Sequence, residues 1–478
     1  MSAALLERLA TLAAAVSLAA CAGLPSLERT PVPSLPAPAP AWQAPLPHAG
    51  QPTDLVRWWA QFDDPVLVQL IDAAQAASPT LASAQGRIAQ ARASRVAAGA
   101  ALLPRVDAGA GAARRHISPL TLTESNLNAD LQASWEIDLF GANRASRDAA
   151  QARLEGAQAS WHEARVSVAA ETASSYTALR GCEAQRALSE IDAASRAETD
   201  RLTTLSERAG FSSPANAALA RASAAQGRSL VTGQRARCDT LLKSIVALTA
   251  LDEPALRSQL AAGSAQVPVA APIAPVQVPA ALIEQRPDLT IAAREVSAAA
   301  ADRDSAAAQQ WPRVSLSGSI GALRVSTSAV SASGSTWAIG PLQVTFPIFD
   351  GGTRAAQTDA ARAAYDEAVA LYQARLRTAV QEVEEALVAL QSTAERQPDA
   401  AAAAEGFENS LRATEARYKG GLASLFELED ARRSAVVANS TLIELKRERA
   451  SAWVALYRAL GGGWTVADLN QSAAATPR

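Results

Sequence analysis

The sequence has 478 residues, enough for two or three ordinary domains, and 49% of them are apolar although only 4% are aromatic. Its 44 basic and 47 acidic residues give a formal net charge of −3, so it lacks the basic surplus that is typical of nucleic-acid-binding proteins. The three histidines (His48, His116 and His162) form no metal-ligand pattern, and there is no Gly-rich phosphate loop, zinc motif or nucleophile elbow. These observations argue against a nucleic-acid partner, an enzyme and a bound metal or cofactor.

The N-terminus has the features of a bacterial lipoprotein signal peptide. An apolar run that is too short to span a bilayer ends in Leu18-Ala19-Ala20-Cys21, which resembles a lipobox. We expect residues 1–20 to be removed, Cys21 to carry a covalent lipid, and the proline-rich residues 21–54 to form an extended tether. An ordinary signal peptide followed by a chance cysteine is the alternative. Ala22 stands where lipoproteins kept at the inner membrane typically have aspartate, which favours an outer-membrane location.

The rest of the chain is an internal repeat. Leu103-Pro104-Arg105-Val106 matches Trp311-Pro312-Arg313-Val314, 208 residues later (312 − 104). Gly210 likewise matches Gly421, 211 residues later (421 − 210). The offset between matching positions changes only from 208 to 211 residues, which predicts two copies of one structural unit. The expected boundaries are a first repeat at 55–262, an extended crossover at 263–280, a second repeat at 281–462 and a C-terminal tail at 463–478.

Each repeat contains two segments in which apolar and polar residues alternate, as they do in strands with one apolar face. The clearest segments run from Leu131 to Leu139 in the first repeat, and from Val314 to Ile320 and Leu342 to Ile348 in the second. Segments of this kind are typical of a membrane barrel wall. Four strands cannot close a barrel, whereas three chains would supply twelve (4 × 3). A soluble four-stranded sheet packed on helices is the alternative.

Long helices are expected after the strands. The stretch from Ala142 to Arg208 has 67 residues (208 − 142 + 1) and no proline, and would be roughly 100 Å long as a helix. Its counterpart runs from Thr353 to Tyr418, with Pro398 as the one break. Helices of this length suit a coiled-coil tube.

Each long helix is expected to turn back on itself as a helical hairpin. Gly210 and the pair Gly420-Gly421 would supply the positive φ that ends a helix, and Ser213 and Ser424 would cap the helix that follows. A plain turn between helices, without a binding role, is the alternative.

Two cysteines lie at equal distances from the first turn. Cys182 is 28 residues before Gly210 (210 − 182) and Cys238 is 28 residues after it (238 − 210), so they would sit at the same height of an antiparallel hairpin. Because an exported protein reaches an oxidising compartment, we hypothesise a disulfide between them. Two free, buried thiols are the alternative.

Taken together and in order, the motifs resemble the TolC-type outer-membrane efflux family, in its NodT-like and OprM-like lipoprotein branch. The stretches that carry the resemblance are 58–65 (WWAQFDDP), 134–141 (SWEIDLFG), 285–289 (QRPDL), 346–352 (FPIFDGG) and 417–424 (RYKGGLAS). The resemblance implies a mainly α-helical fold with a membrane β segment: a trimeric 12-stranded β-barrel on a long coiled-coil tunnel, without catalytic residues.

The resemblance also implies roles for the hairpin tips and for one helical face. The tip residues Gly210, Ser213, Gly420, Gly421 and Ser424 would meet a periplasmic adaptor protein. Four further residues would line a closed periplasmic aperture: Tyr418, Phe426, Asp430 and Arg433. The last three share a helical face by their spacing, so charge pairs between Asp430 and Arg433 could hold a trimer shut. A solvated face of an ordinary helix is the alternative.

The implied function is passive. The chain would be the outer-membrane exit duct of a tripartite pump, with an adaptor protein and an inner-membrane RND-type pump as partners and small molecules or drugs as cargo. Two alternatives remain: a type I secretion channel, and a periplasmic coiled-coil lipoprotein that forms no pore.

Overall fold

The computed structural model describes residues 55–117, 122–269, 285–327 and 330–463, and these form two compact units. The first unit contains residues 92–153 and 295–369, and the second contains the described parts of 35–91, 154–294 and 370–478. The predicted signal peptide, Cys21 and the tether lie outside the described residues, as do most of the crossover and nearly all of the tail.

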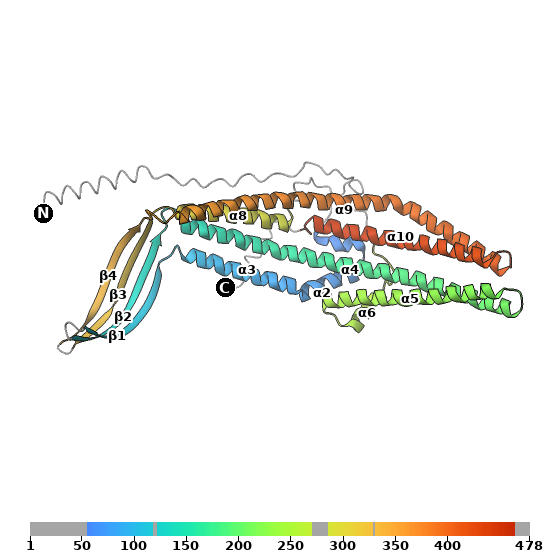
Figure 1. Ribbon diagram of the computed structural model, residues 1–478, viewed down its shortest axis with the longest axis horizontal. Helices are drawn as coiled ribbons and strands as arrows, with labels where there is room; N and C mark the ends of the chain where they lie inside the picture. The colour runs from blue at the N-terminus through green and yellow to red at the C-terminus, as the bar shows by residue number, and fades with distance from the viewer. Residues whose placement is uncertain (1–54, 118–121, 270–284, 328–329, 464–478) are drawn as a thin grey trace. The chain divides into compact units, whose positions relative to one another are not determined.

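The first unit is built around one antiparallel sheet. Its four strands lie in the order β1-β2-β3-β4, so that β1 and β4 form the edges (Figure 1). The strands are β1 (Arg105–Ile117), β2 (Leu122–Ile137), β3 (Arg313–Thr327) and β4 (Ser331–Thr345). The expectation of four strands, two from each repeat, is therefore confirmed.

The two faces of this sheet differ in polarity. In the strand register, Leu131 lies between Ala108 and Ile320, and Ile320 in turn lies beside Trp337. These side chains share an apolar face that stays exposed in the single chain, with Trp337 74% accessible. The opposite face is mostly polar and includes Asp107, Asn128, Asp130, Gln132, Ser317 and Ser319. The sheet thus has one side suited to lipid and one suited to water.

Two strands end earlier than their alternation predicted. β2 ends at Ile137 and does not continue to Leu139, and β4 ends at Thr345 and does not continue to Ile348. The reason is that an aspartate beyond each strand accepts hydrogen bonds from backbone N–H groups at or just before the start of the next helix. Asp138 accepts hydrogen bonds from the N–H groups of Asn143 (3.2 Å) and Arg144 (2.9 Å), and Asp350 accepts them from Gly352 (3.0 Å) and Arg354 (3.3 Å).

In each repeat a helix precedes the two strands and a helical hairpin follows them. A 3₁₀ helix, η2 (Leu55–Phe62), and α2 (Pro65–Ala77) precede α3 (Pro79–Ala100). The first hairpin consists of α4 (Ala142–Arg208) and α5 (Pro214–Thr249), followed by the short α6 (Glu253–Ala261). In the second repeat α8 (Pro287–Ala308) precedes the strands, and α9 (Thr353–Lys419) and α10 (Leu425–Ala459) form the second hairpin. No helix in the described ranges is long and apolar enough to cross a membrane.

Both long helices have 67 residues. For α4 the observed bounds are the predicted ones. For α9 the break expected at Pro398 is wrong, because the helix continues through that residue. Proline removes one backbone donor from the helix, and here Pro398 is exposed while the preceding side chains of Leu387, Leu390 and Thr393 are buried. Packing of the turns that precede Pro398 holds the helix in place there.

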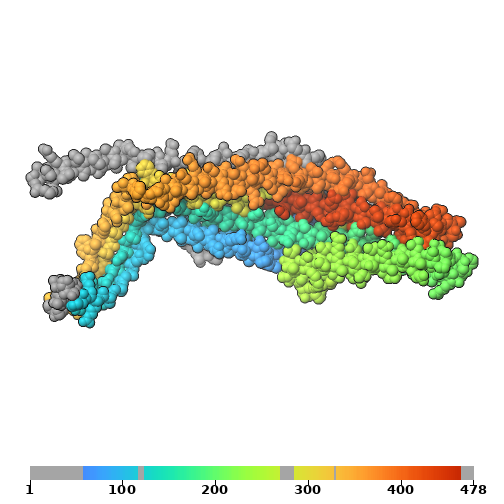
Figure 2. Space-filling model, in the orientation of Figure 1, coloured from blue at the N-terminus to red at the C-terminus, as the bar shows by residue number. Residues whose placement is uncertain are grey.

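The core of the second unit is built from η2, α2, α4, α5, α6, α9 and α10. Trp58 and Trp453 are fully buried, with ring centroids 5.8 Å apart, and Trp59 lies 4.5 Å from the ring of Tyr457. Aromatic rings in such contacts dominate the energetics of a thin helical core. In the space-filling view, α10 (red) lies between α9 (orange) and α4 (green), and Gln185 of α4 donates hydrogen bonds to Ser440 of α10 (Figure 2).

Cys182 and Cys238 join α4 to α5. In the structure they form a disulfide with a Cα–Cα distance of 5.6 Å, and both are buried. This is the pairing suggested by their equal distances from Gly210.

Candidate functional site

The hairpin tips are formed by glycine turns and serine caps. Gly210 and Gly421 have φ values of 79° and 72°, which L-residues rarely adopt. Ser213 accepts a hydrogen bond from the Asn216 N–H and begins α5. Gly420 has no positive φ in the structure, so the expectation that it shares this role with Gly421 is wrong: one left-handed residue is enough for this turn.

The second tip carries a complete capping box. Ser424 Oγ accepts a hydrogen bond from the Glu427 N–H (3.2 Å), and the Glu427 carboxylate accepts one from the Ser424 N–H (2.7 Å). The backbone hydrogen bond from Ser424 is the main reason why the pKa of Glu427 is lowered. Just after each turn glycine an apolar side chain points into solvent: Phe211 is 89% exposed and Leu422 is 73% exposed.

Three of the four predicted aperture residues lie together on the exposed face of α10. Phe426 is 73% exposed, and Asp430 and Arg433 form an ion pair of 3.4 Å with both side chains largely in solvent. Because this pair lies within one chain and is exposed, it contributes only about 0.2–1 kcal/mol. Tyr418 does not join them. Its hydroxyl lies 2.9 Å from Thr203 Oγ1 on α4.

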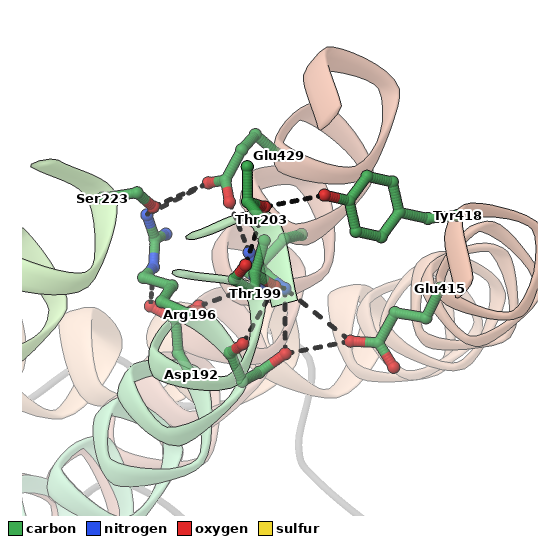
Figure 3. Close-up of polar contacts among 10 residues, drawn as sticks. Asp192, Arg196, Thr199, Thr203, Ser223, Glu415, Tyr418 and Glu429 are labelled. Atoms are coloured by element: carbon green, nitrogen blue, oxygen red, sulfur yellow. Dashed lines mark hydrogen bonds and ion pairs between the residues drawn. The ribbon is translucent and has the colours of Figure 1, made fainter. Parts of the chain in front are cut away.

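Arg432, one residue before Arg433, is the centre of a buried polar network that links the two hairpins. Figure 3 shows this network, with Asp192, Thr199 and Glu429 among the labelled residues. The side chain of Arg432 is 2% exposed. One guanidinium nitrogen binds Glu429 of α10, and another donates to Ser195 Oγ (2.9 Å) and Thr199 Oγ1 (3.0 Å) of α4. Charge-assisted hydrogen bonds of this kind are about twice as strong as neutral ones.

A second guanidinium extends the same network to α5. Arg196 of α4 donates to Asp192 (2.8 Å) and to Ser223 of α5 (2.8 Å), and lies 3.4 Å from Glu429. Ser195 in turn donates to Glu415 of α9 (2.9 Å). The network, which includes the Thr203–Tyr418 contact, therefore ties together α4, α5, α9 and α10. We name these ten residues the hairpin network: Asp192, Ser195, Arg196, Thr199, Thr203, Ser223, Glu415, Tyr418, Glu429 and Arg432.

The hairpin network leaves two buried polar atoms without a hydrogen bond. Arg432 Nε and Asp192 Oδ1 lie 4.0 Å apart, and neither has a hydrogen-bond partner among the described residues. The two atoms therefore interact through the attraction between their opposite charges and not through a hydrogen bond. This makes the network sensitive to the loss of either charge.

Helical spacing in the sequence pointed to Arg433 and not to Arg432. One signal could have found it: the buried residues of α10 include Leu425, Leu428, Arg432 and Ala435, at helical spacing on one face. A charged residue in an apolar stripe is expected to have buried partners. The exposed apolar residues that follow the turn glycines, Phe211 and Leu422, were also missed, although they occupy equivalent positions in the two repeats (422 − 211 = 211).

The described residues offer no grouping of His, Cys, Asp and Glu that could hold a metal ion. What the site provides is mechanical and electrostatic: two capped tips, an exposed face of α10, and a buried charge network that fixes the hairpins to each other.

Comparisons with known proteins assign almost the whole chain to one family. A family model described as "Outer membrane efflux protein" matches residues 70–250 and 278–462, so it matches each repeat. Outer membrane protein OprJ of Pseudomonas aeruginosa is 30% identical, with 94% of each chain covered. Nodulation protein T of Rhizobium leguminosarum bv. trifolii is 29% identical, covering 90% of this chain and 93% of its own.

The solved structures give the same result. The outer-membrane channel OprN superimposes with a TM-score of 0.81 at 27% identity, covering 90% of this chain and 99% of that one. The resemblance noted in the sequence and the mainly helical, two-repeat fold that it implied are both confirmed.

Proposed function

The chain belongs to the outer membrane efflux protein family, and we propose that it is the exit duct of a tripartite efflux pump, through which small molecules leave the periplasm. Members of this family are channels of the outer membrane and not enzymes. The duct adds no chemistry of its own. The energy for transport comes from an inner-membrane RND-type pump, which an adaptor protein connects to the duct.

The observation that carries this function is the sheet with one apolar and one polar face. An exposed Trp337 or Ile339 is unfavourable in water and favourable in lipid. The polar residues behind them, such as Asn128 and Gln132, would face a water-filled bore. A sheet that is half lipid-facing and half water-facing separates two media, as the wall of a pore does.

A homotrimer closes this wall. Both edges of the sheet, β1 and β4, are unpaired among the residues that the structure describes, and unpaired backbone groups are very costly in lipid. Because β1 and β4 run in opposite directions, β4 of one protomer can pair antiparallel with β1 of the next. Three chains of four strands give twelve strands (3 × 4) and no edges.

We place the periplasmic aperture at the end of the helical tunnel that the hairpin tips form. We assign Phe426, Asp430 and Arg433 to its lining, because they lie on the exposed face of α10 next to the tip. The hairpin network, including Tyr418, would keep α9 and α10 against α4 and thereby keep the aperture narrow.

The hairpin tips are the surface for the adaptor protein. The turn residues Gly210, Ser213, Gly420, Gly421 and Ser424 fix the backbone, and Phe211 and Leu422 offer exposed apolar contacts. Apolar side chains that stay in solvent on a rigid, capped turn are suited to fill pockets on a partner.

The N-terminal part anchors the chain in the outer membrane. Lipidation of Cys21 is supported by the lipobox-like sequence before it, and residues 21–54 would span the distance from the lipid to the first helix.

Reconstitution of the purified protein into planar bilayers tests the function. We expect discrete single-channel currents that are small in the closed form. A lipoprotein that forms no pore would give none, and that result would contradict the proposal.

A further inference from the structure

Two arginines lie on the apolar face of the sheet, where a charge is unexpected. The register places Arg114 of β1 beside Ser125, and Arg324 of β3 beside Leu127, which itself lies opposite Ala112. Both arginines therefore share the face of Leu131, Ile320 and Trp337, and both are exposed.

These two guanidinium groups also differ from two on the polar face that do form ion pairs. On the polar face, Arg105 pairs with Asp107 at 2.8 Å and Arg115 pairs with Glu124 at 3.2 Å. Within the parts of the chain that the structure describes, Arg114 and Arg324 form no ion pair. The sequences of the connecting segments 118–121 and 328–329 contain no charged residue that could supply one.

Their height along the strands explains how the sheet tolerates them. On β3 the apolar face runs from Val314 to Ala322, and Arg324 comes ten residues after Val314 (324 − 314). At about 3.3 Å per residue this is roughly 33 Å along the strand, or about 25 Å along the membrane normal at a strand tilt near 40°. That height matches the apolar band of an outer-membrane barrel, about 25 Å. Arg324 therefore lies where the band ends, and the register places Arg114 two positions beyond it.

At the edge of the band an outward arginine meets lipid headgroups. Guanidinium binds phosphate with two parallel hydrogen bonds, and its cost of burial disappears at that depth. Because β2 lies between them and they are staggered by two residues, the Cα atoms of Arg114 and Arg324 are roughly 12 Å apart, as estimated from strand spacing and rise. A headgroup that carries two separated phosphates could reach both.

We propose that Arg114 and Arg324 form a binding surface for phosphorylated lipids of the outer leaflet, and in particular for diphosphorylated glycolipid. This rests on the proposed function, because it requires that the apolar face lies in lipid with the β1–β2 and β3–β4 connections at the outer side. The surface would hold each protomer at a fixed depth in the membrane.

Binding of lipid A to the detergent-solubilised protein tests the proposal. The variant R114Q/R324Q is compared with R105Q/R313Q, which removes the same charge from the opposite face of the same sheet. Each arginine near an anionic surface raises the affinity about fivefold. We therefore expect the apparent Kd for lipid A to rise on the order of 25-fold in R114Q/R324Q. It should be nearly unchanged in R105Q/R313Q. Thermal stabilisation by lipid A should be lost in parallel.

Equal loss of binding in both double variants, or unchanged binding in R114Q/R324Q, overturns the proposal. So does stabilisation by inorganic phosphate as strong as that by lipid A, since the surface would then bind a free anion. Insertion into phosphatidylcholine liposomes, measured on the same samples, separates this result from the proposed function. If no variant and no wild-type protein inserts, the channel function fails. If all insert equally but lipid A binding does not differ, only the lipid surface fails.

Discussion

Replacement of Arg432 by glutamine removes the central charge of the hairpin network. Arg432→Gln keeps a polar side chain of similar length but loses the contacts with Glu429, Ser195 and Thr199. Among the described residues, Arg196 is then the one cation that still pairs with Asp192 and Glu429. The contact between α10 and α4 is therefore weakened where it supports the aperture.

The magnitude follows from burial. Breaking a buried ion pair by removing one partner costs about 3–5 kcal/mol, and the side chain of Arg432 is 2% exposed. At about 1.4 kcal/mol per factor of ten, the equilibrium between closed and opened hairpins should shift on the order of 10²- to 10³-fold toward the opened form. The neighbouring Arg433, in an exposed pair, should give less than about a fivefold shift when replaced by glutamine.

Single-channel recording in planar bilayers measures this shift. R432Q should show longer and larger openings than the wild type, whereas R433Q should resemble the wild type closely. Thermal unfolding of both variants controls for a general loss of stability. If R432Q conducts as the wild type does, or if R433Q has the larger effect, the hairpin network does not hold the aperture and the reasoning is wrong.

Three further predictions concern the disulfide, the sheet and the tip. Alkylation of the intact, unfolded protein should label two more thiols after reduction than before it; equal labelling would contradict the Cys182–Cys238 bridge. Gly321→Val should greatly lower the yield of assembled protein, because a Cβ there would lie 2.5 Å from the Ala129 carbonyl oxygen, while Gly334→Val in open space should assemble normally. Loss of the cap in Ser424→Ala should speed hydrogen exchange of the tip amides about fivefold, and unchanged exchange would mean that the capping box does not hold the turn. In the wild type, Glu427 has a pKa below its ordinary value of 4.5, so its stabilisation of the tip is complete above that pH and is lost as the pH falls through the lowered pKa.

Much of the architecture could be predicted because local signals agreed with the repeat. The bounds of α4 were correct since Gly141 and Gly210 bracket a stretch free of proline, and a glycine can adopt the positive φ found at both positions. The four strands were found from their alternation, which a sheet with two different faces requires.

The errors arose where tertiary contacts decide the outcome. Alternation continued to Leu139 and Ile348 in the sequence, but hydrogen bonds from helix N-termini to Asp138 and Asp350 end the strands first. Pro398 did not break α9, because packing of the preceding turns compensates for one lost donor.

The candidate site could be predicted only in part. Spacing placed Phe426, Asp430 and Arg433 on one face, and they do share it. Spacing along one helix could not show that Arg432 has partners more than 230 residues away, such as Ser195 and Thr199. Such contacts depend on how the two hairpins pack, which periodicity within either one does not specify.

The oligomeric state in mild detergent tests the central claim most directly. Light scattering that subtracts the bound detergent gives the protein mass of the particle. A trimer is the expected result, since three four-stranded sheets close a wall with no free edges. A monodisperse monomer that stays soluble after removal of the N-terminal 54 residues would contradict it. The apolar face of the sheet would then be covered by protein and would not lie in a membrane.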